Sequence, residues 1–407
     1  MKKLLSILCA AVLLATLVIT CVSCGGSSVS ADFKVGAILI GDENEGYTYA
    51  HINGIRTAAK ELGMSDDQII WKYTVPEDEK CYDAAIDLVE QGCSVIFSNS
   101  YGHQSHMKQA AQECPDVTFV AMTGDQAATS GLANYKNAFT GVYQSRYVAG
   151  VVAGMKLAEL VADGKLTDAN YDGENIKLGY VGAYPYAEVV SGYTAYYLGV
   201  KSVVENVTMQ VTYTNSWFDI TAEGTVAEAL AADGCVIISQ HADSTGAPAA
   251  VQALQDKGQV IYCVGYNVDM LSVAPNAALT SPTNTWAVYY KYAIETAANG
   301  GTIDTNWAKG YEADAVGITA LGSACAAGTQ EKVDEVVKGL KDGSIKVFDT
   351  SKFTVGGATL TEYLADVDGD FAPDTNAIWD GYFHESEMRS APYFDIRIDG
   401  IVENNNN

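Results

Sequence analysis

"QGCSVIFSNSYGHQSHMKQAAQECPDVTFVAM" (91–122) and "DGCVIISQHADSTGAPAAVQALQDKGQVIYCVGY" (233–266) follow one plan. Each begins with a polar residue and Gly-Cys, continues as an apolar run that ends in Ser and a polar pair, and then gives an Ala-containing helical stretch and a second apolar run. Apolar runs that alternate with helical patterns indicate parallel strands covered by helices on both faces. We infer two similar α/β domains, although any two strand–helix–strand units resemble each other to some degree.

The same alternation continues on both sides of the two stretches. We expect strands at 35–40, 69–73, 94–98, 117–122, 177–181, 207–213, 235–239 and 260–264. The expected helices cover 50–62, 82–90, 104–113, 193–204, 222–232 and 247–257. A helix over 331–340 and a strand over 345–348 would complete the second domain. Because open parallel sheets bind ligands at the carboxyl ends of their strands, the two domains would present polar loops to a shared cleft.

The amino-terminal residues have the layout of a secretory signal. Lys2 and Lys3 precede an apolar stretch over 4–19, which is shorter than the roughly 20 residues of a membrane span. The sequence "VSC" at 22–24 then resembles a lipobox, in which Cys24 becomes lipidated. We expect a signal peptide over 1–23, a lipidated tether over 24–32 and a protein held at the extracytoplasmic face of a bacterial membrane. A freely secreted protein is the alternative.

Charge and cysteine spacing exclude several classes of partner. The formal net charge of −26 argues against nucleic acid and anionic lipid, because phosphate binding needs an excess of Lys and Arg. Six cysteines follow Cys24 without CxxC or CxxH spacing, so they do not predict a zinc site. Cys93, Cys235 and Cys263 lie in or beside apolar runs and are expected to be buried. The pairing of the six cysteines stays open.

Six loops follow predicted strands: 41–47, 99–104, 183–186, 214–219, 240–244 and 265–269. They contain aromatic, amide and carboxylate side chains but neither Lys nor Arg, whereas an anionic ligand would call for Arg or a Gly-rich helix start. Aromatic walls with a few directional polar groups suit a neutral ring-shaped ligand, such as a base or a sugar. The candidate ligand-binding residues are Asp42, Asn44, Tyr47, Asn99, Tyr101, Tyr184, Asn215, Trp217, Gln240, His241, Asp243, Asn267 and Asp269, together with Trp286.

Several segments resemble a known family when taken in order. "GAILIGDENEGYTYAHINGIRTAAKELG" (36–63), "TGVYQSRYVAGVVAG" (140–154), "VTYTNSWFD" (211–219) and "LTSPTNTWAVYY" (279–290) are similar to the basic membrane protein family of bacterial ABC-transporter binding lipoproteins, in its purine-binding branch. The resemblance covers about 34–300. It implies a type I periplasmic-binding-protein fold, in which two Rossmann-like lobes close around a purine base or nucleoside. Lobe 1 would comprise 33–142 and about 267–305, and lobe 2 would comprise 143–266 and about 306–407.

The resemblance also implies roles for single residues. Tyr47 and Trp217 would flank the base, and directional hydrogen bonds would come from Asn99, Asp243, Asn267 and Asp269. Base and nucleoside both remain open, because the stretch 281–284 lacks the Lys that contacts ribose in the nucleoside-binding relatives. A membrane permease is the implied partner, and no cofactor is implied.

Other chemistries were weighed against this hypothesis. Asp42, Glu43 and Glu45 could be the paired carboxylates of a secreted nucleoside or glycoside hydrolase, but one short loop cannot flank a substrate alone, and Glu43 and Glu45 are expected to be solvated. Asp366, Asp368 and Asp370 alternate as in a calcium loop, yet the stretch lacks the Gly and the Glu of an EF-hand, so a polar turn is expected. A binding lipoprotein for simple sugars remains the alternative within transport.

Overall fold

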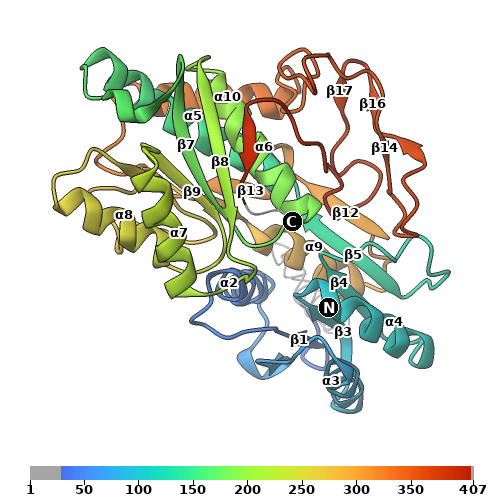
Figure 1. The fold of residues 1–407 in the computed structure, drawn as a ribbon. Coiled ribbons are helices and arrows are strands. Elements are labelled where there is room, and N and C mark those ends of the chain that lie inside the picture. Colours follow the sequence, from blue (N-terminus) through green and yellow to red (C-terminus); the bar gives the residue numbers. More distant parts are fainter. Residues whose placement is uncertain (1–28, 405–407) are drawn as a thin grey trace, which may run out of the picture.

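Two parallel sheets with helices on both faces make up most of the chain (Figure 1). The computed structural model describes residues 29–404, so the predicted signal peptide, Cys24 and most of the predicted tether lie outside the described residues. Within the described part, no helix combines the length and the apolar character needed to cross a bilayer.

The first sheet has the strand order β12-β5-β4-β3-β1-β2 and, with its helices, forms what we call lobe 1. Its strands are β1 (Lys34–Ile38), β2 (Ile69–Lys72), β3 (Cys93–Ser98), β4 (Thr118–Met122), β5 (Tyr135–Thr140) and β12 (Asn306–Lys309). All neighbouring pairs are parallel. One face packs against α2 (Gly46–Glu61) and α9 (Trp286–Ala298), and the other against α3 (Glu79–Glu90) and α4 (Gln104–Glu113). The last strand, β12, begins just beyond the predicted lobe 1 boundary at about 305.

The second sheet has the order β10-β9-β7-β8-β18 and belongs to lobe 2. Its strands are β7 (Asn175–Gly182), β8 (Val207–Tyr213), β9 (Ile237–His241), β10 (Tyr262–Val264) and β18 (Ile401–Glu403), with β6 (Tyr171–Asp172) antiparallel to β7. One face packs against α5 (Val142–Ala162), α6 (Ala187–Lys201) and α10 (Thr329–Asp342), and the other against α7 (Ile220–Ala232) and α8 (Gly246–Asp256).

The chain passes between the lobes at three places. The first lies between β5 and α5, the second between β10 and α9, and the third after β12. Near these passages, β11 (Pro282–Asn284) pairs antiparallel with β13 (Val316–Ile318). The third passage leads to α10 and then to a carboxy-terminal segment, 344–400, with the short strands β14 (Leu364–Ala365), β15 (Thr375–Asn376), β16 (Ile378–Trp379) and β17 (Tyr382–Phe383) (Figure 1, orange to red).

Most predicted elements are confirmed. The helix at 104–113 and the strand at 207–213 have the predicted bounds, and each of the other elements up to 264 overlaps its prediction. The strand predicted at 345–348 is wrong. The ring of Phe348 stacks on Tyr143 and Phe394, but its backbone lies in a turn. The apolar residue therefore reflects packing of its side chain and not a strand. Cys93, Cys235 and Cys263 are buried as predicted, and the six described cysteines are all free thiols.

Candidate functional site

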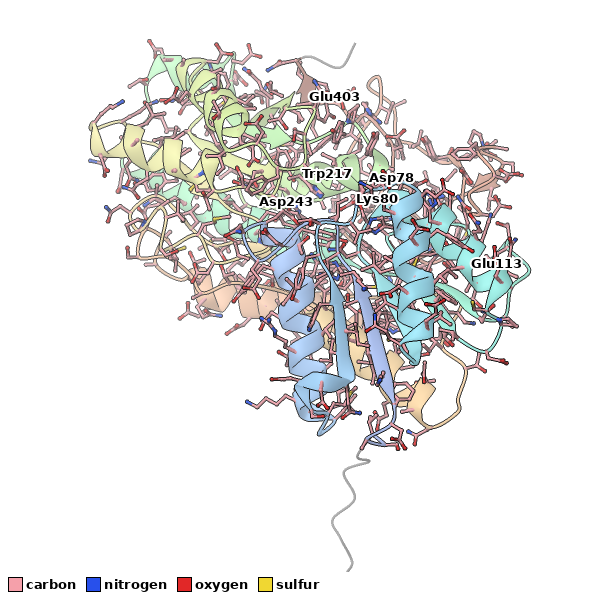
Figure 2. The ribbon with its side chains drawn as sticks, turned by 90° about the horizontal axis from the view of Figure 1, so that it is seen from below. Asp78, Lys80, Glu113, Trp217, Asp243 and Glu403 are labelled. Atoms are coloured by element: carbon pink, nitrogen blue, oxygen red, sulfur yellow. The ribbon has the colours of Figure 1, made fainter. Side chains whose placement is uncertain are left out.

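Loops from the two lobes meet around a groove of about 250 Å³. Lobe 1 contributes the segment 43–49, and lobe 2 contributes Phe218, Ile220, Asp243 and Thr245. The lobes approach closely here, since a Cβ added to Gly46 would lie 3.1 Å from the Asp243 carbonyl oxygen. Figure 2 shows Trp217 and Asp243 near the amino-terminal end of α2, where lobe 2 meets lobe 1. The carboxyl ends of strands from both sheets thus face one another, as the sequence predicts.

The lobe 1 wall is aromatic. The Tyr47 ring meets His51 edge-on at 4.5 Å between ring centroids, and His51 stacks on Trp286 at 4.2 Å. The Tyr47 hydroxyl donates to the Asn99 carbonyl oxygen at 2.8 Å, and the His51 Nδ1 lies 2.7 Å from the Tyr290 hydroxyl. Burial lowers the pKa of His51 well below its usual range. His51 is therefore a neutral part of the packing behind Tyr47, and Trp286 is buried beneath it.

The sequence predicts that Glu45 is solvated, but the structure shows its carboxylate bound by the protein. It is the residue before α2, and its carboxylate accepts the backbone N–H groups of Tyr47 and Thr48, each at 3.0 Å. Burial raises the pKa of Glu45, with a further contribution from Asp42. Glu45 therefore caps the helix that carries Tyr47, while Glu43 is exposed and pairs with Arg56 at 3.0 Å.

The lobe 2 wall is a second aromatic group. Tyr184 and Tyr186 stack at 5.1 Å between ring centroids, and Trp217 lies 5.6 Å from Tyr184. The Asp243 backbone N–H donates to the Trp217 carbonyl oxygen at 2.7 Å, which fixes one loop against the other. Trp217 also lies 6.4 Å from the ring of His241, so the wall continues into the end of β9.

A chain of hydrogen bonds fixes the polar groups at the centre. Asn267 donates its Nδ2 to the Asp243 Oδ1 at 2.9 Å, and Asn284 donates its Nδ2 to the Asn267 Oδ1 at 3.0 Å. The Thr140 hydroxyl donates to the Asn284 Oδ1. Burial raises the pKa of Asp243 well above its usual range, and Glu45 of the opposite lobe adds to the shift. A protonated Asp243 can donate as well as accept a hydrogen bond.

Other predicted residues have their polar groups bound within the protein. The Asn99 Oδ1 accepts from the Ile40 N–H at 2.8 Å, and its Nδ2 donates to the Thr48 hydroxyl at 3.2 Å. The Gln240 Nε2 donates to two loop carbonyl oxygens, while its Oε1 is buried without a partner among the described residues. The Asp42 Oδ1 accepts from the backbone and the side-chain amide of Asn44. These contacts hold the loops in shape.

Of the predicted residues, Asn44 and Asp243 line the groove itself. Three others are exposed and make contacts elsewhere. Tyr101 is 47% exposed, and its hydroxyl donates to Asp125 at 2.9 Å. Asn215 is exposed in a turn with a φ of +56°, and Asp269 is exposed and accepts the Leu271 N–H at 2.8 Å. Each of the three forms a hydrogen bond to another residue of the protein.

Two charged residues of the site were missed by the sequence analysis. Arg146 is fully buried; its Nη1 donates to the Tyr180 hydroxyl at 3.0 Å, and its guanidinium lies 3.7 Å from the centroid of the Tyr266 ring. The Glu188 Oε1 lies 3.4 Å from the His241 Nε2, and burial raises the pKa of Glu188 to about 7. Both residues lie on helices, outside the strand-end loops. A lone Arg in the apolar stretch 142–162 was the signal that could have revealed the first.

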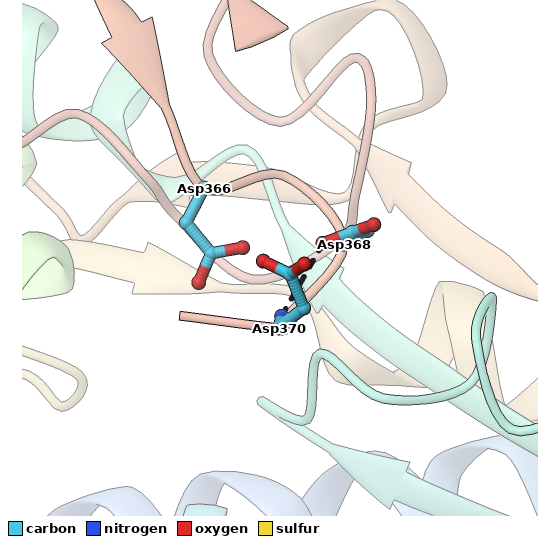
Figure 3. A group of neighbouring side chains, drawn as sticks. All are labelled: Asp366, Asp368 and Asp370. Atoms are coloured by element: carbon cyan, nitrogen blue, oxygen red, sulfur yellow. Dashed lines mark hydrogen bonds between the residues drawn. The ribbon is translucent and has the colours of Figure 1, made fainter. Parts of the chain in front are cut away.

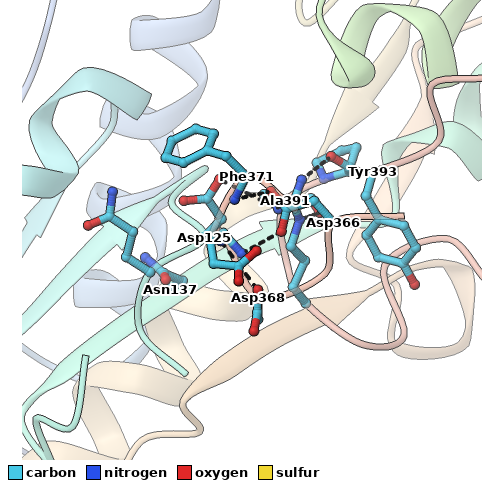
Figure 4. A network of polar contacts seen from close by, with 12 residues as sticks. Asp125, Asn137, Asp366, Asp368, Phe371, Ala391 and Tyr393 are labelled. Atoms are coloured by element: carbon cyan, nitrogen blue, oxygen red, sulfur yellow. Dashed lines mark hydrogen bonds and ion pairs between the residues drawn. The ribbon is translucent and has the colours of Figure 1, made fainter. Parts of the chain in front are cut away.

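The predicted polar turn at 366–370 brings three carboxylates together (Figure 3). The Asp366 oxygens accept the backbone N–H groups of Gly369 and Phe371. Figure 4 shows Asp366 and Asp125 in the same polar network. Arg389 lies 3.9 Å from Asp366 and 3.6 Å from Asp125. A protein cation therefore already neutralises part of this acidic cluster.

Comparisons with known proteins agree with this architecture. The family model described as "ABC transporter substrate-binding protein PnrA-like" (Bmp) matches residues 40–350. A purine-binding protein of Brucella abortus is 32% identical over 65% of this chain and 69% of its own length. A putative ABC transporter glucose-binding protein of Haloferax volcanii is 28% identical over 68% of this chain and 64% of its own length.

A solved ABC transporter solute-binding protein of Aeropyrum pernix superimposes with a TM-score of 0.61 at 16% sequence identity, over 80% of this chain and 94% of its own. At that identity the likeness concerns the fold alone. It confirms the predicted α/β fold with two Rossmann-like lobes.

Proposed function

The chain belongs to the Bmp family of PnrA-like ABC transporter substrate-binding proteins, and from this premise we propose that it binds a purine base or nucleoside between its lobes. The closed, loaded form then delivers the ligand to a membrane permease. The protein acts outside the cytoplasm, as substrate-binding proteins of ABC transporters do. Its amino-terminal Cys24, once lipidated, anchors it to the membrane.

The observation that carries the proposal is that each lobe contributes a group of aromatic rings beside the groove. Tyr47 comes from α2 of lobe 1 and Trp217 from the loop after β8 of lobe 2. Flat rings from opposite lobes can enclose a planar heterocycle, and each stacking contact contributes about 1–3 kcal/mol. The 32% identity to a purine-binding protein supports a purine as that heterocycle.

Polar groups next to the aromatic walls would form hydrogen bonds with the edge of the base. Asp243 and Asn267 form one hydrogen-bonded unit, and His241 lies beside Trp217. A buried polar group that a wrong ligand leaves unpaired costs free energy, which is the basis of selectivity here. We further propose that Asn99 and Gln240 act by shaping the loops, and that Tyr101, Asn215, Asp269, Asp42 and Asn44 contact the ligand weakly or only as the lobes close.

A simple sugar is the second candidate ligand. The relative from Haloferax volcanii is named as a putative glucose-binding protein, and aromatic walls also stack on sugar rings. The two candidates differ in one respect: a purine offers two faces of equal aromatic character and an N–H edge, whereas a sugar offers hydroxyl groups around its rim.

Mass spectrometry of the ligand released by denaturing the purified protein identifies what the protein retains. Calorimetry with adenine, guanosine, inosine and a panel of simple sugars then gives the stoichiometry and the affinity. We expect one purine bound per chain. Stoichiometric binding of a sugar with no response to purines would show that the ligand is a sugar. Turnover of a nucleoside without stoichiometric binding would show that the protein is a hydrolase.

The membrane anchor has a separate test. Labelling of the expressed protein with a palmitate analogue is expected to mark the wild type and not a Cys24→Ser variant. Label that persists in the variant would contradict lipidation at Cys24.

A further inference from the structure

A directional hydrogen-bond chain runs beneath Trp217 in lobe 2. Arg146 of α5 donates its Nη1 to the Tyr180 hydroxyl of β7 at 3.0 Å. A guanidinium can only donate, so the Tyr180 oxygen accepts this bond and its own hydrogen is available to another acceptor. The His241 Nδ1 of β9 lies 3.5 Å from the Tyr180 hydroxyl, within reach of that hydrogen.

The chain favours one tautomer of His241. Burial lowers the pKa of His241 well below its usual range, and Arg146 adds to the shift, so the imidazole is neutral. With Nδ1 as the acceptor, the single proton of the neutral ring lies on Nε2. That Nε2–H points to the Glu188 Oε1 at 3.4 Å. Three groups, from α5, β7 and β9, therefore donate in one direction, and the series ends on the Glu188 carboxylate of α6.

Glu188 faces the region between the lobes. Its side chain is 21% exposed, and it follows Tyr184 and Tyr186, whose rings contact Trp217. Its charge acts on the Tyr47 hydroxyl of the opposite lobe and on Asp243. Within residues 29–404, the bond from His241 is the one hydrogen bond that the Glu188 carboxylate accepts. A carboxylate offers about four acceptor positions, so most of its capacity is open to a ligand.

We propose that Glu188 determines specificity by accepting a hydrogen bond from an N–H group of a heterocycle stacked against Trp217, and that Arg146, Tyr180 and His241 are positioning residues that aim its carboxylate. The inference rests on the proposed function and narrows it to heterocycles with an amino or ring N–H at the edge that meets lobe 2. It also explains the fully buried Arg146, which has no carboxylate within salt-bridge distance among the described residues but stabilises Glu188 electrostatically.

The first test combines variants with ligand analogues. Calorimetry compares the wild type and Glu188→Gln with adenine, with 9-methyladenine and with unsubstituted purine. The isosteric Gln keeps the shape and removes the charge. We expect at least a tenfold loss of adenine affinity in the variant, and a much smaller loss for the analogue that lacks the contacted N–H. Glu228→Gln, an exposed carboxylate on α7, is the matched control and should bind all ligands as the wild type does.

The outcomes distinguish a failure of the proposed role of Glu188 from a failure of the proposed purine binding. A loss of the same size for all three ligands, or no loss, would overturn the role of Glu188 while purine binding by the wild type stands. Absence of purine binding in the wild type would overturn the proposed function itself. Thermal melts of each variant show whether the fold is kept.

A second readout addresses the positioning residues. The charged and titratable groups near Glu188 are Arg146, His241, Tyr47, Tyr180, Tyr266 and Asp243. The carboxylate is the accepting form, so adenine affinity should rise as the pH increases from 6 to 8, and Glu188→Gln should remove that part of the rise. Tyr180→Phe, which interrupts the chain, should weaken adenine binding severalfold and change the pH profile. An unchanged profile in both variants would contradict the inference.

Discussion

Trp217 is the residue on which the proposed ligand contact depends most. It is half-buried, its carbonyl oxygen is fixed by the Asp243 N–H, and its ring is supported by Tyr184. We expect Trp217→Ala to weaken purine binding by about 10–100-fold, since one stacking contact contributes about 1–3 kcal/mol. Trp217→Phe should keep most of the affinity. Calorimetry measures both, and Trp379→Ala, an exposed ring on β16, is the control that should have no effect.

Glu223 provides a test at the residue scale that needs no ligand. It is fully buried on α7 and accepts the Asp219 and Ser244 N–H groups, and burial raises its pKa to about 7. Between pH ~4.5 and ~7 the folded state therefore binds more protons than the unfolded state, so the free energy of unfolding decreases as the pH rises through this window. The full effect of the shift is on the order of 3 kcal/mol.

Urea denaturation at pH 5 and pH 8 measures this dependence. The loss of stability between the two values should be smaller in Glu223→Gln than in the wild type, because the variant has no proton to release at that position. Glu188, with its pKa also near 7, contributes to the remaining dependence. Equal losses in the two proteins would show that Glu223 does not titrate in this range.

Candidate site residues could be predicted from the sequence where their position at the end of a strand decides where they lie in the fold. Tyr47, Trp217 and Asp243 follow strands, and the end of a parallel strand faces the cleft whatever packs around it. Glu188 and Arg146 lie on helices, where the facing direction depends on how the helix packs. Asp269 also follows a strand, and one of its carboxylate oxygens accepts the Leu271 N–H.

At the scale of elements, α5 and α6 make the closest contact between helices in lobe 2. Gly150 lies so near α6 that an added Cβ would be 2.1 Å from the Tyr196 carbonyl oxygen. Such an overlap forces the helices apart. Gly150→Ala should therefore lower the free energy of unfolding by about 1–3 kcal/mol, even though alanine is the better helix former.

Gly224→Ala is the matched control for this contact. Gly224 lies inside α7, and an added Cβ would meet the Gly246 carbonyl oxygen at 3.4 Å, an ordinary contact. With no overlap to offset it, the higher helix propensity of alanine should leave stability unchanged or raise it by up to about 1 kcal/mol. Thermal and urea unfolding compare the two variants, and equal effects would mean that the α5–α6 contact has room to adjust.

Helix α4 was predicted from the sequence, whereas strand β5 was not. Helix α4 has an apolar face and a polar face, so its bounds could be predicted. Strand β5 includes Lys136 and Asn137, both buried. The Asn137 side chain is buried because it bonds the Ala121 carbonyl oxygen and the Ala127 N–H, partners that only the tertiary structure brings within reach.

For the whole molecule, the carboxy-terminal segment is a part that joins the two lobes in addition to the three passages. Residues beyond 350 lie outside the family match, yet they contact both lobes. The Ser390 hydroxyl donates to Asn306 of β12 at 3.3 Å, and Thr129 donates to the Asp368 carbonyl oxygen at 3.2 Å. On the other side, Phe394 belongs to the core of lobe 2. Opening of the lobes therefore strains or breaks these contacts.

Arg389 is the centre of this connection and gives the last prediction. It is buried, donates its Nε to the Ala391 carbonyl oxygen, and lies 3.6 Å from Asp125 of lobe 1. In Arg389→Met, Asp125 keeps the hydrogen bond from Tyr101 but loses its cation. We expect a loss of stability of about 3 kcal/mol and, without ligand, a larger radius of gyration in small-angle scattering, because the lobes separate more freely.

Two further variants distinguish the cause. Asp125→Asn combined with Arg389→Met removes both charges, so it should recover much of the stability but keep the larger radius, since the connection between the lobes is still absent. Lys352→Met removes an exposed cation of the same segment and should change neither quantity. If the double variant instead restores the compact radius, the buried charge left in Arg389→Met, and not the missing connection, opens the lobes.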